Sequence, residues 1–216
     1  MEGDGATLSP FLLLSFDIIP SSGRARGAGA GGEGEKAMFI RTDRLFLRPP
    51  FPEDWRETYR GIGHKGVVRM LARAPWPYTP EDAREFCNRP RHDADMGFAI
   101  TLPDEPGAPL IGQVGLNRED GGTWEAGYWL AQERRGQGYM TEALTGVLET
   151  ARALGIDRVE AGHYVDNPAS GAVLRRCGFV ETGELRPTVA KGRGGETVLA
   201  RRYALDLVDN SLPAAA

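Results

Sequence analysis

Residues 133–144 read ERRGQGYMTEAL and place two spaced glycines directly before a helical pattern that covers residues 139–154. The first N–H groups of a helix have no partner inside the helix, and the helix dipole adds partial positive charge to them. Gly136 and Gly138 let the backbone approach a bound group closely, because glycine has no Cβ. With two arginines beside the glycines, the stretch predicts an anion-binding turn. The alternative is a turn that only reverses the chain and carries solvated arginines.

The P-loop is excluded because the chain has no GxxxxGK[S/T] motif, and the two glycines of this turn are not part of a GxGxxG motif, since residues 136–141 read GQGYMT. The chain has 216 residues, of which 41% are hydrophobic, enough for one domain with a sizeable core. Its net charge of −4 argues against a general nucleic-acid binder. The two cysteines, Cys87 and Cys177, show neither metal-ligand spacing nor a disulfide framework, which suits a reducing compartment.

The N-terminal part of the chain does not have the composition of a folded domain. Residues 9–19 form an apolar run too short to span a bilayer, and no basic segment precedes it as in a signal peptide. Residues 20–37 are rich in glycine and alanine and bury little surface. We therefore expect a disordered extension at 1–37, either native or the product of a misplaced start, a folded domain at 38–208 and a flexible tail at 209–216.

The order of the expected elements predicts a single α+β (mixed α/β) domain. A Rossmann domain would alternate strand and helix from its start, and this chain does not. Thr79, Pro80 and Asp82 form a typical helix start. We expect helices at 52–72, 79–88, 139–154 and 167–178. We expect strands at 39–48, 97–102, 110–118, 123–130, 157–165, 179–185 and 196–207, the third and fourth as a hairpin.

The segment RRGQGYMTEAL resembles the acetyl-CoA pyrophosphate loop of the GNAT superfamily of N-acetyltransferases, written Q/R-x-x-G-x-G/A. Glu133, Gly136 and Gly138 match both glycines but place Glu first, whereas Arg135, Gly138 and Met140 match the arginine and end in Met. Three further blocks resemble the branch that acetylates the N-termini of ribosomal proteins. They are PWPYTPEDA at 75–83, WEAGYWL at 124–130 and NPASGAVLRRCGFVETG at 167–183.

The resemblance implies a mostly antiparallel twisted sheet of about six to seven strands, flanked by about four helices, with strands four and five splayed apart. Acetyl-CoA would lie in that gap, its pantetheine arm paired with the strand-four backbone at Tyr128, Trp129 and Leu130. The pyrophosphate would bind backbone amides of the glycine turn, to which Thr141 adds a hydroxyl. The implied amides are those of Arg135, Gly136, Gln137, Gly138, Tyr139 and Met140. Arg176 would reach the 3′-phosphate, unless it only complements the helix dipole.

The resemblance also implies direct attack of a neutral amine on the thioester. Glu125 is the candidate base, with a solvated strand residue as the alternative. Asn167 would bond the cofactor or a water, and it also suits a helix N-cap. Ser170 would protonate the leaving thiolate or only contact the cofactor, because Leu174 stands where some family members have a tyrosine. Glu142, in the first turn of the helix that follows the loop, is expected to be solvated or packed against that helix.

We therefore expect an acetyl-CoA-dependent N-acetyltransferase that acts on a protein N-terminus or a small primary amine, without a metal. The alternatives are a catalytically silent acyl-CoA-binding module and an enzyme that uses another acyl donor. We expect a cytoplasmic monomer or homodimer that binds no nucleic acid and no membrane. The loop at 186–197 is expected to border the acceptor site, with Trp76 and Tyr78 either on its other side or in the core.

Overall fold

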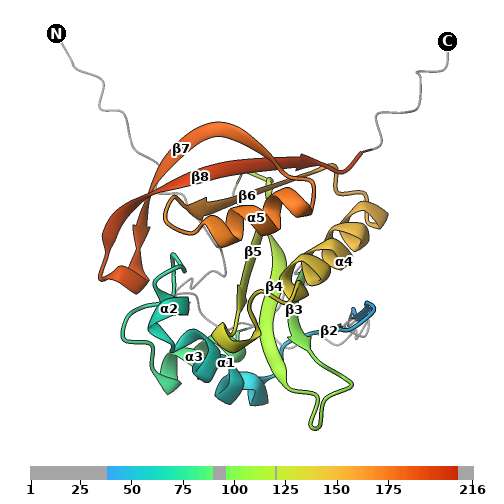
Figure 1. Ribbon diagram of the computed structural model, residues 1–216, viewed down its shortest axis with the longest axis vertical. Coiled ribbons are helices and arrows are strands. Elements are labelled where there is room, and N and C mark those ends of the chain that lie inside the picture. The colour runs from blue at the N-terminus through green and yellow to red at the C-terminus, as the bar shows by residue number, and fades with distance from the viewer. Residues whose placement is uncertain (1–37, 90–95, 120, 209–216) are drawn as a thin grey trace, which may run out of the picture.

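The computed structural model describes residues 38–89, 96–119 and 121–208 and contains one open eight-stranded sheet in the order β1-β2-β3-β4-β5-β6-β8-β7 (Figure 1). The segments at 1–37 and 209–216, for which we expect an extension and a tail, lie outside these residues. The strands are β1 (Ile40–Arg41), β2 (Phe46–Arg48), β3 (Met96–Thr101), β4 (Leu110–Arg118), β5 (Trp124–Leu130), β6 (Arg158–Tyr164), β7 (Val180–Ala190) and β8 (Glu196–Asp206). The helices are α1 (Trp55–Ile62), α2 (Lys65–Val68), α3 (Pro80–Cys87), α4 (Tyr139–Ala153) and α5 (Pro168–Arg176), with short 3-10 turns at Pro52–Asp54, Gln132–Arg134 and Lys191–Arg193.

The mixed α/β fold is confirmed, with one strand more than the expected six to seven. The single strand expected at 39–48 is two strands, because the chain turns between β1 and β2 and pairs them antiparallel. The helix expected at 52–72 is also divided. Gly63 ends α1, and His64 adopts an extended conformation and caps α2. The capping box predicted at Thr79 is present, and α3 begins at Pro80.

The sheet divides between β5 and β6. These two strands run parallel and pair only at Trp124, Glu125 and Ala126, whereas β4 stays paired with β5 as far as Leu130. On its other side β6 pairs with β8 along its whole length, through Tyr164. The two halves of the sheet therefore diverge beyond Ala126, as Figure 1 shows, and the splay expected between strands four and five is present.

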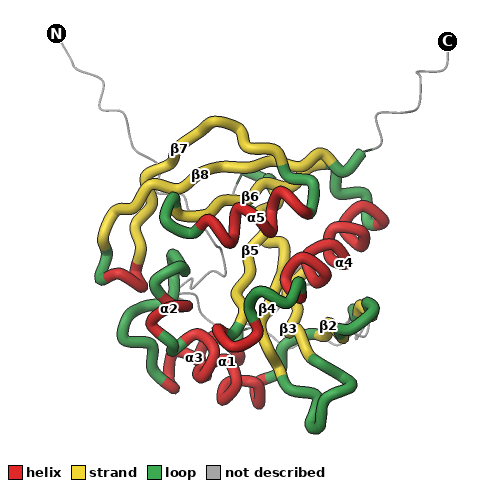
Figure 2. Tube along the Cα trace, in the orientation of Figure 1, coloured by secondary structure: helices red, strands yellow, loops and turns green. Residues whose placement is uncertain are grey.

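Helices cover β5 on both faces. The apolar face of α4 packs into the largest hydrophobic cluster, against which Tyr128 also packs. Trp129 belongs to a second cluster with α1, α3 and the segment between them. Successive strand residues point to opposite faces, and Tyr128 and Trp129 are neighbours in β5. The two clusters therefore lie on opposite sides of this strand. Figure 2 shows α4 and α5 on one side of β5 and α1 to α3 gathered at its C-terminal end.

The last two strands form a long hairpin, and the prediction of a loop at 186–197 is wrong. Strand β7 continues to Ala190 and β8 begins at Glu196, which leaves only a short turn. Strand β7 includes Pro187, and it is an edge strand, where proline is tolerated. The turn packs on the segment after α2, because the Lys191 N–H donates to the Ala72 carbonyl at 2.9 Å. The hairpin thus joins the end of the chain to its first helices.

Candidate active site

The glycine turn lies at the end of β5, and its two glycines adopt a left-handed conformation. Gly136 has φ of +77° and Gly138 has φ of +82°, values that other residues adopt only with strain. Gly138 is the N-cap of α4, and the Glu142 N–H donates to its carbonyl at 3.0 Å. The turn therefore delivers the chain into α4 without a side chain at either glycine.

The turn presents a row of unpaired backbone donors. No acceptor in the described part of the chain bonds the N–H groups of residues 136–141. Arg135 differs, because its N–H already donates to the Gln132 carbonyl at 3.3 Å. The amides of the other predicted residues, Gly136, Gln137, Gly138, Tyr139 and Met140, remain available together with that of Thr141. Such a row at a helix start is suited to a phosphate group.

Arg44, which the sequence did not single out, supports this turn from the first hairpin. Its Nη1 donates to the Gln137 carbonyl at 3.0 Å, and its guanidinium lies 4.6 Å from the centre of the Tyr139 ring. Its Nε donates to Glu142 Oε2 at 2.7 Å. Arg44 is 93 residues away from Gln137 in the sequence, so no local pattern reveals the contact.

Glu142 is neither solvated nor packed only against its own helix. Besides Arg44, it accepts a hydrogen bond from Thr42 Oγ1 at 2.6 Å and one from the Arg44 backbone N–H at 2.8 Å. Burial alone would raise the pKa of Glu142, but these hydrogen bonds and the Arg44 charge lower it below its ordinary value. The carboxylate therefore stays charged and ties the β1–β2 turn to α4.

The strand β5 offers backbone groups to the gap at alternate residues. The Ala131 N–H donates to the Ile111 carbonyl on β4 at 2.8 Å. Backbone groups alternate in direction along an antiparallel ladder, so those of Trp129 also face β4, opposite Gln113. Those of Tyr128 and Leu130 face the gap instead. Of the three residues predicted to pair with the pantetheine arm, these two have the required direction, and Trp129 does not.

Ser170 and Tyr128 meet across the gap. The Tyr128 hydroxyl lies 2.8 Å from Ser170 Oγ and donates to the Ser170 carbonyl at 3.2 Å. Ser170 is buried near the start of α5, and burial raises the pKa of Tyr128 above its ordinary value. The phenol is therefore neutral and shares a hydrogen bond with the serine hydroxyl. The sequence predicted a role only for the backbone of Tyr128, because nothing local indicates that its side chain reaches α5.

Asn167 and Arg176 occupy the two ends of α5. Asn167 is the N-cap residue, but its side chain makes no capping hydrogen bond within the described residues, so its carboxamide can bond another partner. Arg176 is exposed in the last turn. No contact of the described residues tests its predicted role with the 3′-phosphate. Both residues keep the roles predicted for them as proposals.

Glu125 is not placed where the prediction required it. It pairs with Glu160 in the part of the sheet where β5 and β6 are still joined, and only 3% of it is exposed. Both of its oxygens accept hydrogen bonds from Arg202, at 2.6 and 3.0 Å. Burial raises the pKa of Glu125, and the Arg202 guanidinium opposes that rise. We therefore do not retain Glu125 as the base, because its carboxylate is enclosed by a structural ion pair.

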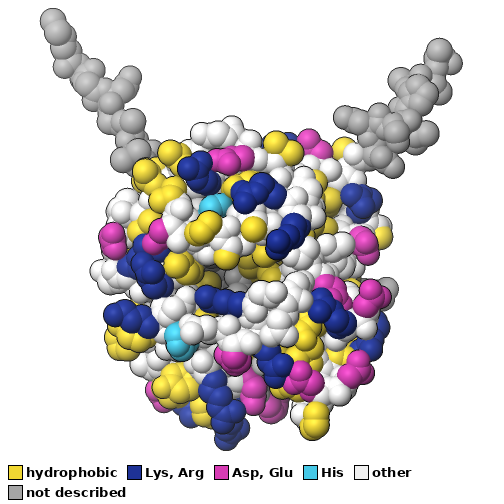
Figure 3. Space-filling view, viewed as in Figure 1, with side chains coloured by type: hydrophobic (Ala, Val, Ile, Leu, Met, Phe, Trp, Pro, Cys, Tyr) yellow, Lys and Arg dark blue, Asp and Glu magenta, His cyan; other side chains and the backbone are white. Residues whose placement is uncertain are grey.

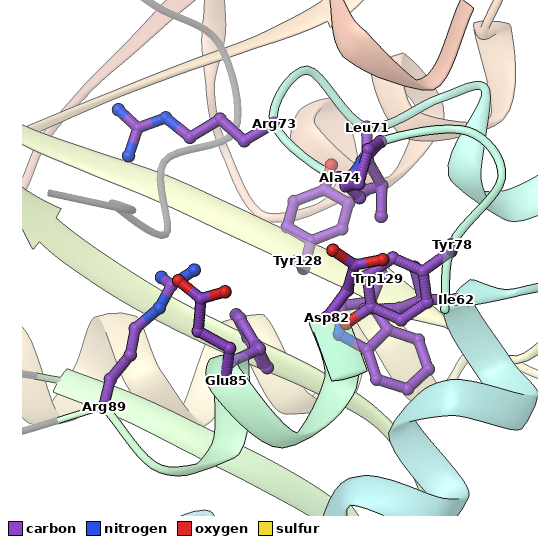
Figure 4. A pocket seen from close by; sticks show the side chains of 12 residues that line it. Ile62, Leu71, Arg73, Ala74, Tyr78, Asp82, Glu85, Arg89, Tyr128 and Trp129 are labelled. Carbon is purple, nitrogen blue, oxygen red and sulfur yellow. The ribbon is translucent and has the colours of Figure 1, made fainter. Parts of the chain in front are cut away.

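A pocket opens beside β5, between α1, α3 and the segment that joins α2 to α3 (Figure 4). Tyr78, Tyr128 and Trp129 are among its walls. Trp76 does not line this pocket and is 42% exposed. On the face that carries α4 and α5, Figure 3 shows hydrophobic side chains at the bottom of a central hollow.

Two general features bear on the chemistry. In residues 38–89, 96–119 and 121–208, no three His, Cys, Asp or Glu side chains are grouped so that they could hold a metal ion. The same residues contain no helix that is both long and apolar enough to cross a membrane.

Comparison with known proteins identifies the family. The acetyltransferase (GNAT) domain family matches residues 44–180, more than half of the chain. The chain belongs to the GNAT family of N-acetyltransferases. The uncharacterized N-acetyltransferase YnaD of Bacillus subtilis (strain 168) is 27% identical over 157 residues, 72% of this chain and 90% of that protein. The ribosomal-protein-serine acetyltransferase of Escherichia coli (strain K12) is 36% identical over 92 residues, 41% of this chain and 49% of that protein.

Solved structures of GNAT proteins show the same fold. An acetyltransferase of the GNAT family from Bacillus anthracis matches with a TM-score of 0.69 and 23% identity, over 79% of this chain and 99% of that one. The Microcin C7 self-immunity acetyltransferase MccE, solved with acetyl-CoA and AMP, matches with a TM-score of 0.64 and 21% identity, over 76% of this chain and 93% of that one. At these identities the likeness concerns the GNAT fold alone.

Proposed function

We propose that this GNAT protein transfers an acetyl group from acetyl-CoA to a primary amine by direct attack in a ternary complex. The observation that carries the proposal is the row of unpaired N–H groups at residues 136–141, beside the point where β5 and β6 diverge. The backbone N–H groups can bind a pyrophosphate. Where β5 and β6 diverge, the backbone of β5 can pair with the amides of the pantetheine arm. MccE, which shares the fold and was solved in complex with acetyl-CoA, supports the choice of acyl donor.

The residues around the gap would divide the work of binding. The amides of residues 136–141 would hold the pyrophosphate, and the backbone of Tyr128 and Leu130 would pair with the pantetheine amides. The carboxamide of Asn167 would bond the cofactor or a water molecule. Arg176 would contact the 3′-phosphate. Arg44 and Glu142 would keep the turn in the conformation that exposes its amides.

The transfer needs a neutral amine and a proton for the leaving thiolate. The amine nitrogen attacks the thioester carbonyl, and collapse of the tetrahedral intermediate breaks the carbon–sulfur bond. We assign the proton of the leaving thiol to Ser170 Oγ, which the Tyr128 hydroxyl supports as hydrogen-bond partner, and the proton that the attacking nitrogen loses restores Ser170. A terminal α-amine, with a pKa of about 7.7–8.0, is partly neutral at physiological pH. It therefore needs less help from a base than a lysine does, which suits a site in which Glu125 does not act as the base.

A protein N-terminus remains a candidate acceptor because one relative is a ribosomal-protein-serine acetyltransferase. The second candidate function is a silent acyl-CoA-binding module, which the same row of amides would also serve. Two measurements on the full chain separate them: calorimetry with acetyl-CoA, and release of free CoA thiol in the presence of amines. We expect binding together with amine-dependent release. Binding without release for any amine or peptide would support the module, and the absence of binding would contradict both.

A further inference from the structure

The turn between β7 and β8 is bonded to residues 69–75, which follow α2 and are called the wall segment below. The Lys191 N–H donates to the Ala72 carbonyl at 2.9 Å. Two residues further along the turn, Arg193 Nε donates to the Arg69 carbonyl at 2.8 Å. The first of these bonds belongs to the backbone of the turn, and the second belongs to a side chain.

Close packing reinforces these two bonds. A Cβ on Gly192 would overlap the Val68 carbonyl oxygen, so the turn approaches the end of α2 more closely than another residue would allow. Ala72 of the wall segment is buried in one apolar cluster with Tyr164 of β6 and Ala190 of β7. The wall segment therefore lies between the hairpin turn and the end of β6.

Arg193 also reaches the end of β6. Its Nη2 donates to Asp166 Oδ1 at 2.8 Å, and its guanidinium lies 4.8 Å from the centre of the Tyr164 ring. Its hydrogen bond and its charge hold the pKa of Asp166 below the ordinary value, so the carboxylate stays charged. Only 11% of the Arg193 side chain is exposed. One side chain thus joins the wall segment to the residue that precedes Asn167.

The two parts that Arg193 joins are two sides of the proposed site. Four residues of the wall segment line the pocket beside β5 (Figure 4): Leu71, Arg73, Ala74 and Pro75. Tyr128 lines the same pocket, and its hydroxyl lies 2.8 Å from Ser170 Oγ on α5. Under the proposed function Ser170 stands beside the thioester sulfur, so an amine in this pocket is next to the acetyl group. The distance between the pocket wall and Ser170 then depends on Arg193.

We propose that Arg193 is a positioning residue for the acceptor amine, because it fixes the wall segment relative to the start of α5. The inference rests on the proposed function and adds a residue that governs how the acceptor binds. Arg193 acts through the wall segment and Asp166 and not on the reacting atoms. An arginine suits this task, since its planar fork bonds a carbonyl and a carboxylate in one fixed geometry.

Arg193→Ala in the full chain should raise KM for the acceptor and leave both kcat and the affinity for acetyl-CoA nearly unchanged. The acceptors tested are phenethylamine, putrescine and a peptide that begins with serine, and the one with the highest kcat/KM in the unmodified chain is used for the variants. We expect KM to rise about 10-fold, because binding of the acceptor must then order a loosened wall segment. A saturating acceptor restores that order, so kcat should remain.

Two further variants separate the fork from charge alone. Lys191→Ala removes a positive charge from the same turn, where Lys191 is exposed, and keeps its backbone bond to Ala72. It should leave KM unchanged. Arg193→Lys keeps a charge beside Asp166 without the fork, so KM should rise less, about 3-fold. The lysine variant also provides the test if Arg193→Ala does not fold.

Amide hydrogen exchange measures the wall segment without any acceptor. In Arg193→Ala the amides of residues 69–74 should exchange about 10-fold faster, because a local opening needs less free energy. The amides of β4 should keep their exchange rates. This comparison distinguishes a loosened wall segment from a protein that is less stable throughout.

The inference and the proposed function fail in different ways. An unchanged acceptor KM in Arg193→Ala, or an equal rise in Lys191→Ala, would overturn the inference while the acetyltransferase reaction stood. A loss of affinity for acetyl-CoA as large as the rise in acceptor KM would overturn it too, because Arg193 would then support the whole fold. An absence of turnover with every acceptor, despite binding of acetyl-CoA, would overturn the proposed function and the inference with it.

Discussion

Arg44 and Glu142 form an ion pair of 2.7 Å between residues that are 98 positions apart in the sequence. The pair joins the turn between β1 and β2 to the first turn of α4. A second contact of Arg44, from Nη1 to the Gln137 carbonyl, fixes the position of that carbonyl in the glycine turn. Arg44 is therefore a positioning residue for the proposed pyrophosphate site.

Replacing Arg44 with alanine should weaken binding of acetyl-CoA and leave turnover nearly unchanged. The loss of the Gln137 contact allows the glycine turn to move, so we expect KM for acetyl-CoA to rise about 5-fold. Arg41→Ala is the matched control. Arg41 is equally exposed, at 51% against 49%, but it pairs with Asp104 rather than with Glu142. An equal rise of KM in both variants, or a fall of kcat alone in Arg44→Ala, would contradict this role.

Placing a carboxylate at Gly138 should abolish binding of acetyl-CoA. The new side chain would stand among the amides that we assign to the pyrophosphate, where charge repulsion adds to steric overlap. Gly183→Asp is the control, because Gly183 has the same φ of +82° and a Cβ there meets nothing within 4 Å. Calorimetry should show lost binding in Gly138→Asp and normal binding in Gly183→Asp. Normal affinity in both would refute the placement of the pyrophosphate.

Removing the hydroxyl of Ser170 should reduce turnover far more than affinity. If Ser170 protonates the thiolate, Ser170→Ala should lower kcat about 100-fold, within the usual range for a proton donor. Tyr128→Phe should lower kcat less, about 5-fold, because it removes only the partner of the serine. Single-turnover kinetics and the dissociation constant of acetyl-CoA check both variants. A loss of affinity as large as the loss of turnover would limit Ser170 to holding the cofactor.

Removing Arg202 from its buried ion pair with Glu125 should lower the free energy of unfolding. Arg202 bonds Glu125 and Glu160 and so joins β5, β6 and β8 below their divergence. Arg202→Met would leave two carboxylates without a partner, and we expect a loss of about 3–5 kcal/mol in the free energy of unfolding. Denaturant titration measures it.

Glu125→Gln should retain measurable turnover once folded, whereas complete inactivity of a stable Glu125→Gln variant would restore Glu125 as the base.

Local patterns in the sequence predicted the parts of the fold that depend on near neighbours. The Thr79 capping box, the β4–β5 hairpin and the start of α4 at Gly138 each depend on residues only a few positions apart. Hydrogen bonding within a turn and the periodicity of apolar residues determine such features without the rest of the chain. The glycine turn was predicted for the same reason.

Contacts between distant residues decided the rest. Strand β7 lies at the edge of the sheet, where Pro187 is tolerated. It therefore continues where a loop was expected. Glu125 is buried and bonds Arg202, which is 77 residues away in the sequence. The Tyr128 hydroxyl contacts Ser170, which is 42 residues away. The sequence by itself determined that a helix start with exposed amides follows β5. Only the tertiary structure decided which side chains face that site, because burial and partners depend on segments that the folded sheet brings together.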